Sequence, residues 1–201
     1  MIPAPLYRDP IYDGAADPMI IRKVSDGKYY MFYTQRRANQ QVTGVSFAYG
    51  TQIGVAESEN GSQWHYRGAL NLDFEFGHNT FWAPEIVYDE DTERYHMYVS
   101  YIQGIYADWS GKATIEHYVS KDLFYWDHIG TLEFGSSRII DPAITVCRTA
   151  LGECGTRMKI KILRLAMLTV LTCTIGNIVA SPRVTVSRKV PMCLRWVGNT
   201  G

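Results

Sequence analysis

Three acidic residues stand beside prolines at the edges of short apolar runs, and they are the residues best placed to do chemistry. They are Asp17 in YDGAADPMII, Glu85 in FWAPEIV and Asp141 in IIDPAI. Proline fixes its own φ, lacks an N–H and pushes the residue before it towards an extended conformation. Each step therefore belongs at a strand entrance, where a carboxyl group is held rigidly enough to act as a general acid or base.

The sequence after the first two prolines repeats itself. Pro18 is followed by KYYMFYT and IGVAESENGSQWHYRGAL, and Pro84, 66 residues later, is followed by RYHMYVS and IEHYVSKDLFYWDHIGTL. Within the longer segments four identical residues recur 62 positions apart: Ser58 and Ser120, Trp64 and Trp126, Gly68 and Gly130, Leu70 and Leu132. A repeat of about 60 residues with several strands is typical of β-propeller blades. A β-sandwich with similar hairpins is the alternative, and two blades cannot close a ring.

Each repeat predicts four antiparallel strands, so the fold class is all-β. We expect strands at 19–24, 29–34, 53–58 and 63–67, and again at 85–88, 95–101, 114–120 and 125–130. Asp26 and Gly27, between two apolar runs, are a strong hairpin signal. Residues 36–49 form a polar loop that can hold an edge strand. Trp64 and Trp126 fall once in each repeat and are expected in the core.

The composition changes abruptly near residue 146. Residues 1–146 hold 19 acids, 11 bases and every Tyr and Phe, whereas residues 147–201 hold nine bases, one acid, all four Cys and a single Trp. The first part has no charge pattern that would attract nucleic acid or an anionic membrane. The cysteines lack CxxC spacing and histidine partners, which disfavours zinc, while a disulfide framework stays open. The opening MIPAPLYRDP is not a signal peptide, which slightly favours the cytoplasm.

The three proline motifs, in this order on a propeller-like repeat, resemble the family 43 glycoside hydrolases. The resemblance covers roughly residues 5–146 and implies a five-bladed β-propeller, here the first two blades and the start of a third. Members hydrolyse arabinofuranosides or xylosides with inversion. The resemblance implies that Asp17 is the general base and that Asp141 orients the general acid and tunes its pKa. The alternatives are a turn-capping Asp17 and a strand-entry Asp141 that binds nearby backbone.

The general acid of this family is a Glu that opens the fourth blade, and residues 147–201 contain no Glu-Gly-Pro or similar step to supply it. Inversion requires two carboxyl groups about 6.5–9.5 Å apart, with water between the base and the sugar. The family often carries calcium or another ion in its central channel, but no ligand set for it can be identified in this sequence, and we expect no cofactor.

Aromatic and imidazole side chains near the second motif are candidates for sugar binding. Trp82 and Phe81 either stack on a sugar ring or pack in the core. His78 either lines the channel or lies on the surface.

Two kinds of role remain open for the other acids. Glu85 either contacts substrate or pairs with a base across the channel. Asp13 and Asp9 either stabilise the lead-in loop or hydrogen-bond a sugar.

A one-nucleotide frameshift near Val146 would explain the foreign composition of residues 147–201. Read one base earlier, the codons for residues 146–159 can encode LPDGTWRMWYKDE, a strand-turn-strand like KVSDGKYYMFYT. Those for residues 188–201 can encode EGPNVFKVGGKYW, which contains the missing Glu. We therefore expect a partial propeller domain at 1–146 and an out-of-frame tail at 147–201 that does not fold natively. A divergent tail or a membrane segment is the alternative, although the apolar stretch 165–180 is shorter than the ~20 residues needed to span.

These observations predict a glycosidase that acts on an oligo- or polysaccharide, with little or no turnover by this truncated chain. No nucleic acid or membrane partner is expected. The alternatives are a non-catalytic carbohydrate-binding propeller fragment, or a related propeller enzyme such as a fructosidase or a glycoside phosphorylase.

Overall fold

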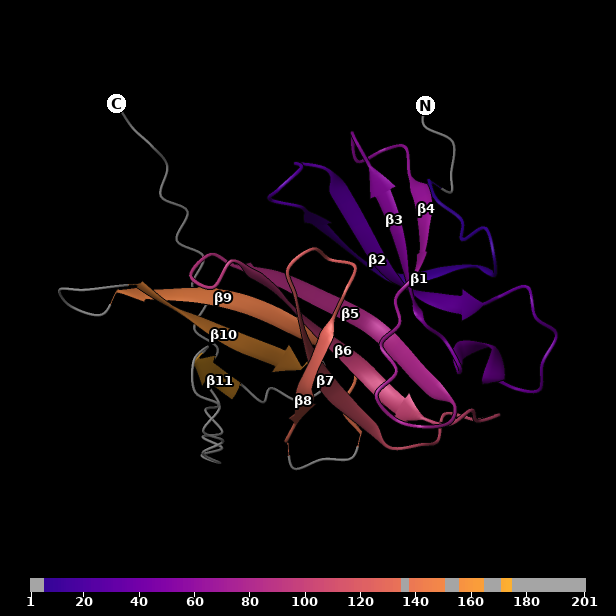
Figure 1. The fold of residues 1–201 in the computed structure, drawn as a ribbon. Coiled ribbons are helices and arrows are strands. Elements are labelled where there is room, and N and C mark those ends of the chain that lie inside the picture. The colour runs from indigo at the N-terminus through magenta and orange to yellow at the C-terminus, as the bar shows by residue number, and fades with distance from the viewer. Residues whose placement is uncertain (1–5, 135–137, 151–155, 165–170, 175–201) are drawn as a thin grey trace, which may run out of the picture.

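The computed structural model describes residues 6–134, 138–150, 156–164 and 171–174, which form three antiparallel sheets (Figure 1). The first sheet pairs four strands in chain order: β1 (Asp13–Arg22), β2 (Tyr29–Arg37), β3 (Ile53–Ser58) and β4 (His65–Ala69). The second repeats this order: β5 (Asn79–Asp89), β6 (Arg94–Gln103), β7 (Ala113–Ser120) and β8 (Asp127–Leu132). The third contains β9 (Pro142–Ala150), β10 (Thr156–Arg164) and β11 (Leu171–Thr174).

All eight strands predicted in the two repeats are confirmed, and the all-β class with them. The polar loop predicted within residues 36–49 is confirmed, but its possible edge strand does not form, and a short 3-10 helix, η1 (Ser46–Ala48), lies there. Gly44 has φ +57°, and this conformation brings the loop close to the Ala107 carbonyl, which accepts a hydrogen bond from Val45 N at 3.0 Å. The loop therefore pairs with the β6–β7 loop instead of extending a sheet.

The 62-residue repeat is confirmed at the level of single hydrogen bonds. Ser58 Oγ accepts from the backbone N–H of Gly61 at 2.9 Å, and Ser120 Oγ accepts from that of Leu123 at 2.9 Å. Gly68 and Gly130 both have positive φ, +126° and +150°, and each lies where its strand pairing shifts register. Glycine reaches this region without steric cost, so both outer strands are bent at the same place.

The main hydrophobic core fills the space between the first two sheets. Alternate residues of β2, β3 and β6 point into it, as the period of a strand requires. Its buried members include Phe32, Ile53, Val55, Ile86, Met97, Val99 and Tyr118. Trp126 packs edge-on against Phe32, and Trp64 packs on a smaller cluster around Tyr33, so both tryptophans contribute to packing as expected. Each precedes its outer strand by one residue.

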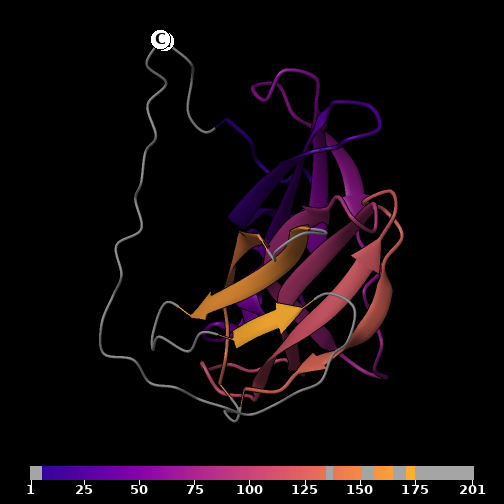
Figure 2. The same ribbon diagram turned by 90° about the vertical axis from the view of Figure 1, so that its left-hand side faces the viewer.

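The first strands of the three sheets are neighbours, since β1 contacts β5 and β5 contacts β9 (Figure 2). The strand entrance predicted for each proline step is confirmed only for Asp141-Pro142, which begins β9, whereas Pro18 and Pro84 lie within β1 and β5, at shifts of register. β9 runs across residue 146, the expected domain boundary. That residues 147–201 are read out of frame stays a prediction.

Much of the tail, including 165–170 and 175–201, lies outside the described residues. Most of the apolar stretch 165–180 is therefore not described, and neither are residues 188–201, whose codons could supply the missing Glu. Within the part of the chain that the structure describes, no helix is long and apolar enough to cross a membrane.

Stability of the second sheet should depend on pH through a buried histidine. Burial lowers the pKa of His117 to about 3, with further lowering from His96 and His128. Its ring stacks on Tyr98 and lies 2.9 Å from His96 Nδ1. The unfolded chain binds this proton near pH 6.5, so stability is complete above that pH and is lost as pH falls towards 3. Between pH 7 and pH 5 the free energy of unfolding should fall by about 2 kcal/mol through His117 alone.

Urea unfolding at both pH values measures this dependence. His117→Gln should flatten it, while the exposed His65→Gln serves as the matched control and should leave it unchanged. An equal pH dependence in both variants would contradict the assignment.

Candidate active site

Each of the three motif prolines follows a residue in the left-handed conformation. The φ angle is +49° at Asp17, +46° at Ala83 and +58° at Asp141, so the extended conformation expected for Asp17 is wrong. The reason is a change of register at this step between β1 and β2, and likewise between β5 and β6, which makes each a bulge. A left-handed residue other than glycine costs about 1–2 kcal/mol. Strain of this kind gathers at functional sites when surrounding contacts enforce it.

Hydroxyl groups on the second strands hold these left-handed residues across the seams between sheets. Thr34 Oγ1 in β2 accepts a hydrogen bond from Ala83 N at 2.9 Å, and Ser100 Oγ in β6 accepts one from Asp141 N at 2.8 Å. Thr34 and Ser100 are 66 residues apart, the same spacing as Pro18 and Pro84. The same link thus joins the first sheet to the second and the second sheet to Asp141.

Asp17 lies at the first seam with two polar partners. Thr34 Oγ1 donates to its Oδ2 at 3.3 Å, and Arg36 Nη2 is 3.4 Å from the same oxygen. The Asp17 side chain keeps 42% of its surface exposed. A carboxylate that is oriented by neighbours and open to solvent can accept a proton from a bound water.

Asp141 has a different environment from Asp17. Enclosure by neighbouring atoms raises the pKa of Asp141, the negative charge of Asp17 raises it further, and the Arg36 guanidinium partly opposes the rise. The charge of Asp17 therefore reaches Asp141, and Arg36 interacts with both. The surroundings of Asp141 therefore favour its protonated form.

Removing the Ser100 hydroxyl should loosen this arrangement. Ser100 is 1% exposed, so Ser100→Ala leaves Asp141 N without its acceptor and should lower the free energy of unfolding by about 1–2 kcal/mol. Ser100→Thr keeps an oxygen at the same position, as at Thr34, and is the matched control. Urea unfolding midpoints compare the two variants. An equal loss of stability in both would show that the volume of the side chain determines stability here and the hydrogen bond does not.

The two aromatic candidates differ in exposure. Trp82 is half-buried, its Nε1 donates to Ala48 O at 2.6 Å, and its ring packs near Tyr49 and Trp109. Phe81 is 1% exposed and belongs to the core between the sheets, which favours the packing role over sugar stacking.

The remaining candidates have other partners than Asp17. Glu85 faces β9, burial raises its pKa, and the backbone of Ile144 opposes this with a hydrogen bond. His78 is exposed, and its carbonyl accepts from Gly104 N. Asp13 pairs on the surface with Arg8 at 2.7 Å. The structure therefore couples Asp17 and Asp141 electrostatically, places Glu85 beside β9 and leaves His78 and Asp13 exposed.

Three polar residues of the site were missed by sequence reasoning: Thr34, Arg36 and Ser100. The 66-residue spacing of Thr34 and Ser100 was a usable signal, because it matches that of the prolines. No comparable sequence signal marks Arg36, since its distance to Asp17 depends on the bulge in β1. No group of three or more His, Cys, Asp or Glu side chains among the described residues could hold a metal ion, so we assign no calcium ligands.

This chain is similar in sequence to known glycosyl hydrolases. A family model described as a probable glycosyl hydrolase domain, related to glycosyl hydrolase family 43, matches residues 7–137. Arabinan endo-1,5-alpha-L-arabinosidase C of Emericella nidulans is 34% identical over 88 residues, 42% of this chain and 23% of that protein. The chain therefore spans about a quarter of the length of this curated relative.

Two solved structures share the fold at low identity. The N-acetylgalactosamine deacetylase of F. plautii, solved with blood group B trisaccharide, matches with a TM-score of 0.55 and 15% identity, over 74% of this chain and 40% of that one. A Bacteroides ovatus ATCC 8483 protein assigned as a glycoside hydrolase matches with a TM-score of 0.52 and 15% identity, over 79% and 46%. This likeness concerns the fold alone.

Proposed function

Because this chain belongs to the family of probable glycosyl hydrolase domains related to glycosyl hydrolase family 43, we propose that it carries the first part of an inverting glycosidase. The observation that carries the proposal is the pair of left-handed Asp-Pro steps, Asp17 on the first sheet and Asp141 beyond the second, both interacting with Arg36. Two carboxyl groups at neighbouring seams that both interact with Arg36 are suited to dividing the roles of base and pKa modulator.

The sheets would be consecutive blades of a five-bladed propeller, two of them complete and the third begun. The contacts of β1 with β5 and of β5 with β9 support this arrangement, as do the matching hydroxyl links at Thr34 and Ser100. In a closed ring, further blades would follow β9 and enclose a central channel lined by the first strands.

The proposed chemistry is inverting hydrolysis. Asp17 takes a proton from the water that attacks the anomeric carbon, and a Glu on the opposite side of the sugar donates a proton to the leaving oxygen. Asp141 keeps that acid protonated and oriented. The Glu would come from the shifted reading frame of residues 188–201. The chain as written lacks it, so we expect little or no turnover from it.

The bond cleaved would be a terminal arabinofuranosyl or xylosyl linkage. The Emericella nidulans relative is named an endo-acting arabinosidase of arabinan, so its 34% identity makes arabinose the sugar to test before xylose and internal 1,5 linkages a substrate to test beside terminal ones.

Hydrolysis assays on two proteins test the proposal: the 201-residue chain and the product of the gene with one nucleotide inserted near codon 146. With linear 1,5-arabinan and aryl arabinofuranoside or xyloside, only the frame-restored product should turn over. Specific turnover by the 201-residue chain would refute the need for a downstream acid. Sugar binding by both proteins without turnover, unaffected by Asp17→Ala, would favour a binding module, and dependence on phosphate would indicate a phosphorylase.

A further inference from the structure

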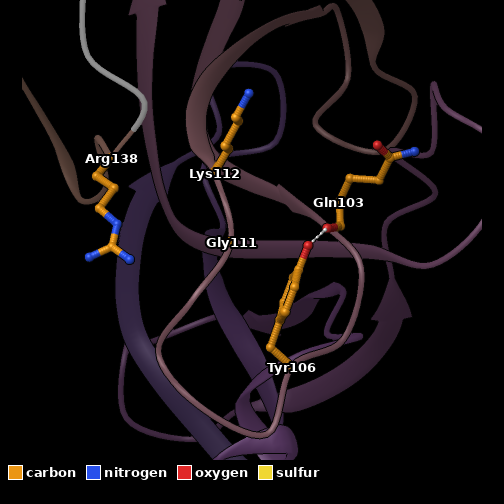
Figure 3. Close-up of a pocket in the computed structure, with 5 residues that line it drawn as sticks. All are labelled: Gln103, Tyr106, Gly111, Lys112 and Arg138. Atoms are coloured by element: carbon orange, nitrogen blue, oxygen red, sulfur yellow. Dashed lines mark hydrogen bonds between the residues drawn. The ribbon is translucent and has the colours of Figure 1, made fainter.

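A pocket of about 460 Å³ lies where β6 ends and β7 begins (Figure 3), and the proposed reaction does not use it. It is lined by Gln103, Tyr106, Gly111, Lys112 and Arg138. Its volume falls within the range of small-molecule sites. Two of these five described residues carry positive charge and none is acidic. Figure 3 shows Arg138 on one side of Lys112, with Tyr106 and Gln103 on the other.

The β6–β7 loop is built around the Tyr106 ring. Gly104 and Gly111 have φ of +103° and +100°, and a Cβ on either would lie 3.1 or 2.9 Å from that ring. The ring therefore fits where only glycine leaves room. Tyr106 Oη donates to Gln103 O at 3.0 Å, which fixes the ring as one wall of the pocket.

The pocket lies beside the candidate active site. Arg138 pairs with Ala113 at the start of β7, and Ile139 N donates to Ala113 O at 3.2 Å. Asp141 follows Arg138 by three residues, a span of at most about 10 Å. Trp109, in the β6–β7 loop, is 60% exposed, and its ring lies 6.3 Å from the ring of Trp82. Because Trp82 precedes Ala83, exposed aromatic surface extends from the pocket loop towards the candidate active site.

The charges at the pocket favour an anion. Asp108 is an acidic neighbour: hydrogen bonds from Ser110 lower its pKa, and Arg138 adds to this effect. Its carboxylate already accepts from Ser110 N at 3.0 Å. Lys112 and Arg138 thus place two positive charges in the lining of the pocket. A guanidinium matches the planar fork of a carboxylate, and an ammonium adds a point charge.

We propose that this pocket binds the carboxylate of a uronic acid residue in the polysaccharide substrate, while the exposed face of Trp109 contacts a neighbouring sugar. Sugars present apolar ring faces that stack on aromatic side chains, and their carboxylates give the charge that Lys112 and Arg138 complement. The inference rests on the proposed function in taking the ligand to be a sugar, and it adds that the preferred polymer is acidic.

Calorimetric titration of the 201-residue chain with α-1,4-digalacturonate tests the inference, with its dimethyl ester as an uncharged ligand of the same sugars. The acid should bind about fivefold more tightly than the ester at low salt, as expected for exposed charge pairs. The difference should shrink at high salt. Lys112→Gln with Arg138→Gln should abolish it, and Arg138→Lys should retain part of it. Lys121→Gln, an exposed lysine just after the far end of β7, is the control and should change nothing.

A neutral arabino-oligosaccharide separates the two proposals. Equal binding of acid and ester, together with binding of the arabino-oligosaccharide, would overturn the uronate site and leave the proposed function standing. If galacturonate monomer bound as tightly as the dimer, the Trp109 contact would be wrong. Failure of all these sugars to bind would overturn the uronate site alone, because the proposed function is judged by hydrolysis with the frame-restored protein.

Discussion

Replacing Asp9 by alanine is expected to lower the free energy of unfolding by about 3 kcal/mol, the largest stability change we anticipate for a single residue outside the core. Asp9 is 3% exposed. Its carboxylate accepts hydrogen bonds from Tyr12 N and Tyr33 Oη, both at 2.6 Å, and from Gln35 Nε2 at 2.9 Å. Burial and this hydrogen bond raise the pKa of Tyr33, so its phenol remains a donor. Alanine would leave Tyr12 N without this acceptor and would remove one of two partners from Tyr33 Oη and from Gln35 Nε2.

Asp13→Asn is the control for Asp9→Ala, because asparagine tolerates the left-handed φ of +61° at Asp13 and removes only the charge. Asp13 is an acid four residues away, but its partner Arg8 is exposed, so its loss should cost less than about 1 kcal/mol. Urea unfolding of both variants measures the difference. Similar midpoints would show that the buried network contributes no more than a surface ion pair. Because Tyr33 and Gln35 flank Thr34, the Asp9 variant should also loosen the contact of Thr34 with Asp17.

Asp17→Asn in the frame-restored protein is expected to lower kcat by about 10²–10⁴-fold, the usual contribution of a general base. Asparagine keeps the size of the side chain and can still bind Thr34, but it cannot accept a proton from water. KM should change little, because the same groups remain to hold the sugar. Steady-state hydrolysis of aryl arabinofuranoside measures both constants.

Asp13→Asn, on the same strand, is the control for that experiment and should keep nearly full activity. A kcat for Asp17→Asn within a few-fold of the unsubstituted protein would exclude Asp17 as the base. A loss confined to KM would make Asp17 a sugar-binding residue instead.

Much of the fold could be predicted because local patterns carry it. Alternation of apolar residues gave the strands, and the 62-residue recurrence gave the matching turns at Ser58 and Ser120. These features depend on neighbours in sequence, which a single chain displays. The η1 loop was missed because its conformation is set by Ala107, about 60 residues away.

The site was predictable only in part. The proline steps marked Asp17 and Asp141, but the rule that proline favours an extended neighbour gave the wrong φ at both. That rule describes an isolated dipeptide, whereas here the hydrogen bond from Asp141 N to Ser100 and the bulge in β1 override it. Phe81 and Trp82 are adjacent and both aromatic. Their side chains alternate across β5, and only this alternation decides that Phe81 is buried and Trp82 is half-buried.

The stereochemistry of the first product formed by the frame-restored protein tests the central claim most directly. Proton NMR of aryl arabinofuranoside hydrolysis, recorded before the anomers equilibrate, should show the product with inverted configuration, and Asp17→Asn should remove the signal. A retained configuration would require a carboxylate nucleophile instead of a base acting through water. It would contradict the roles proposed here for Asp17 and Asp141.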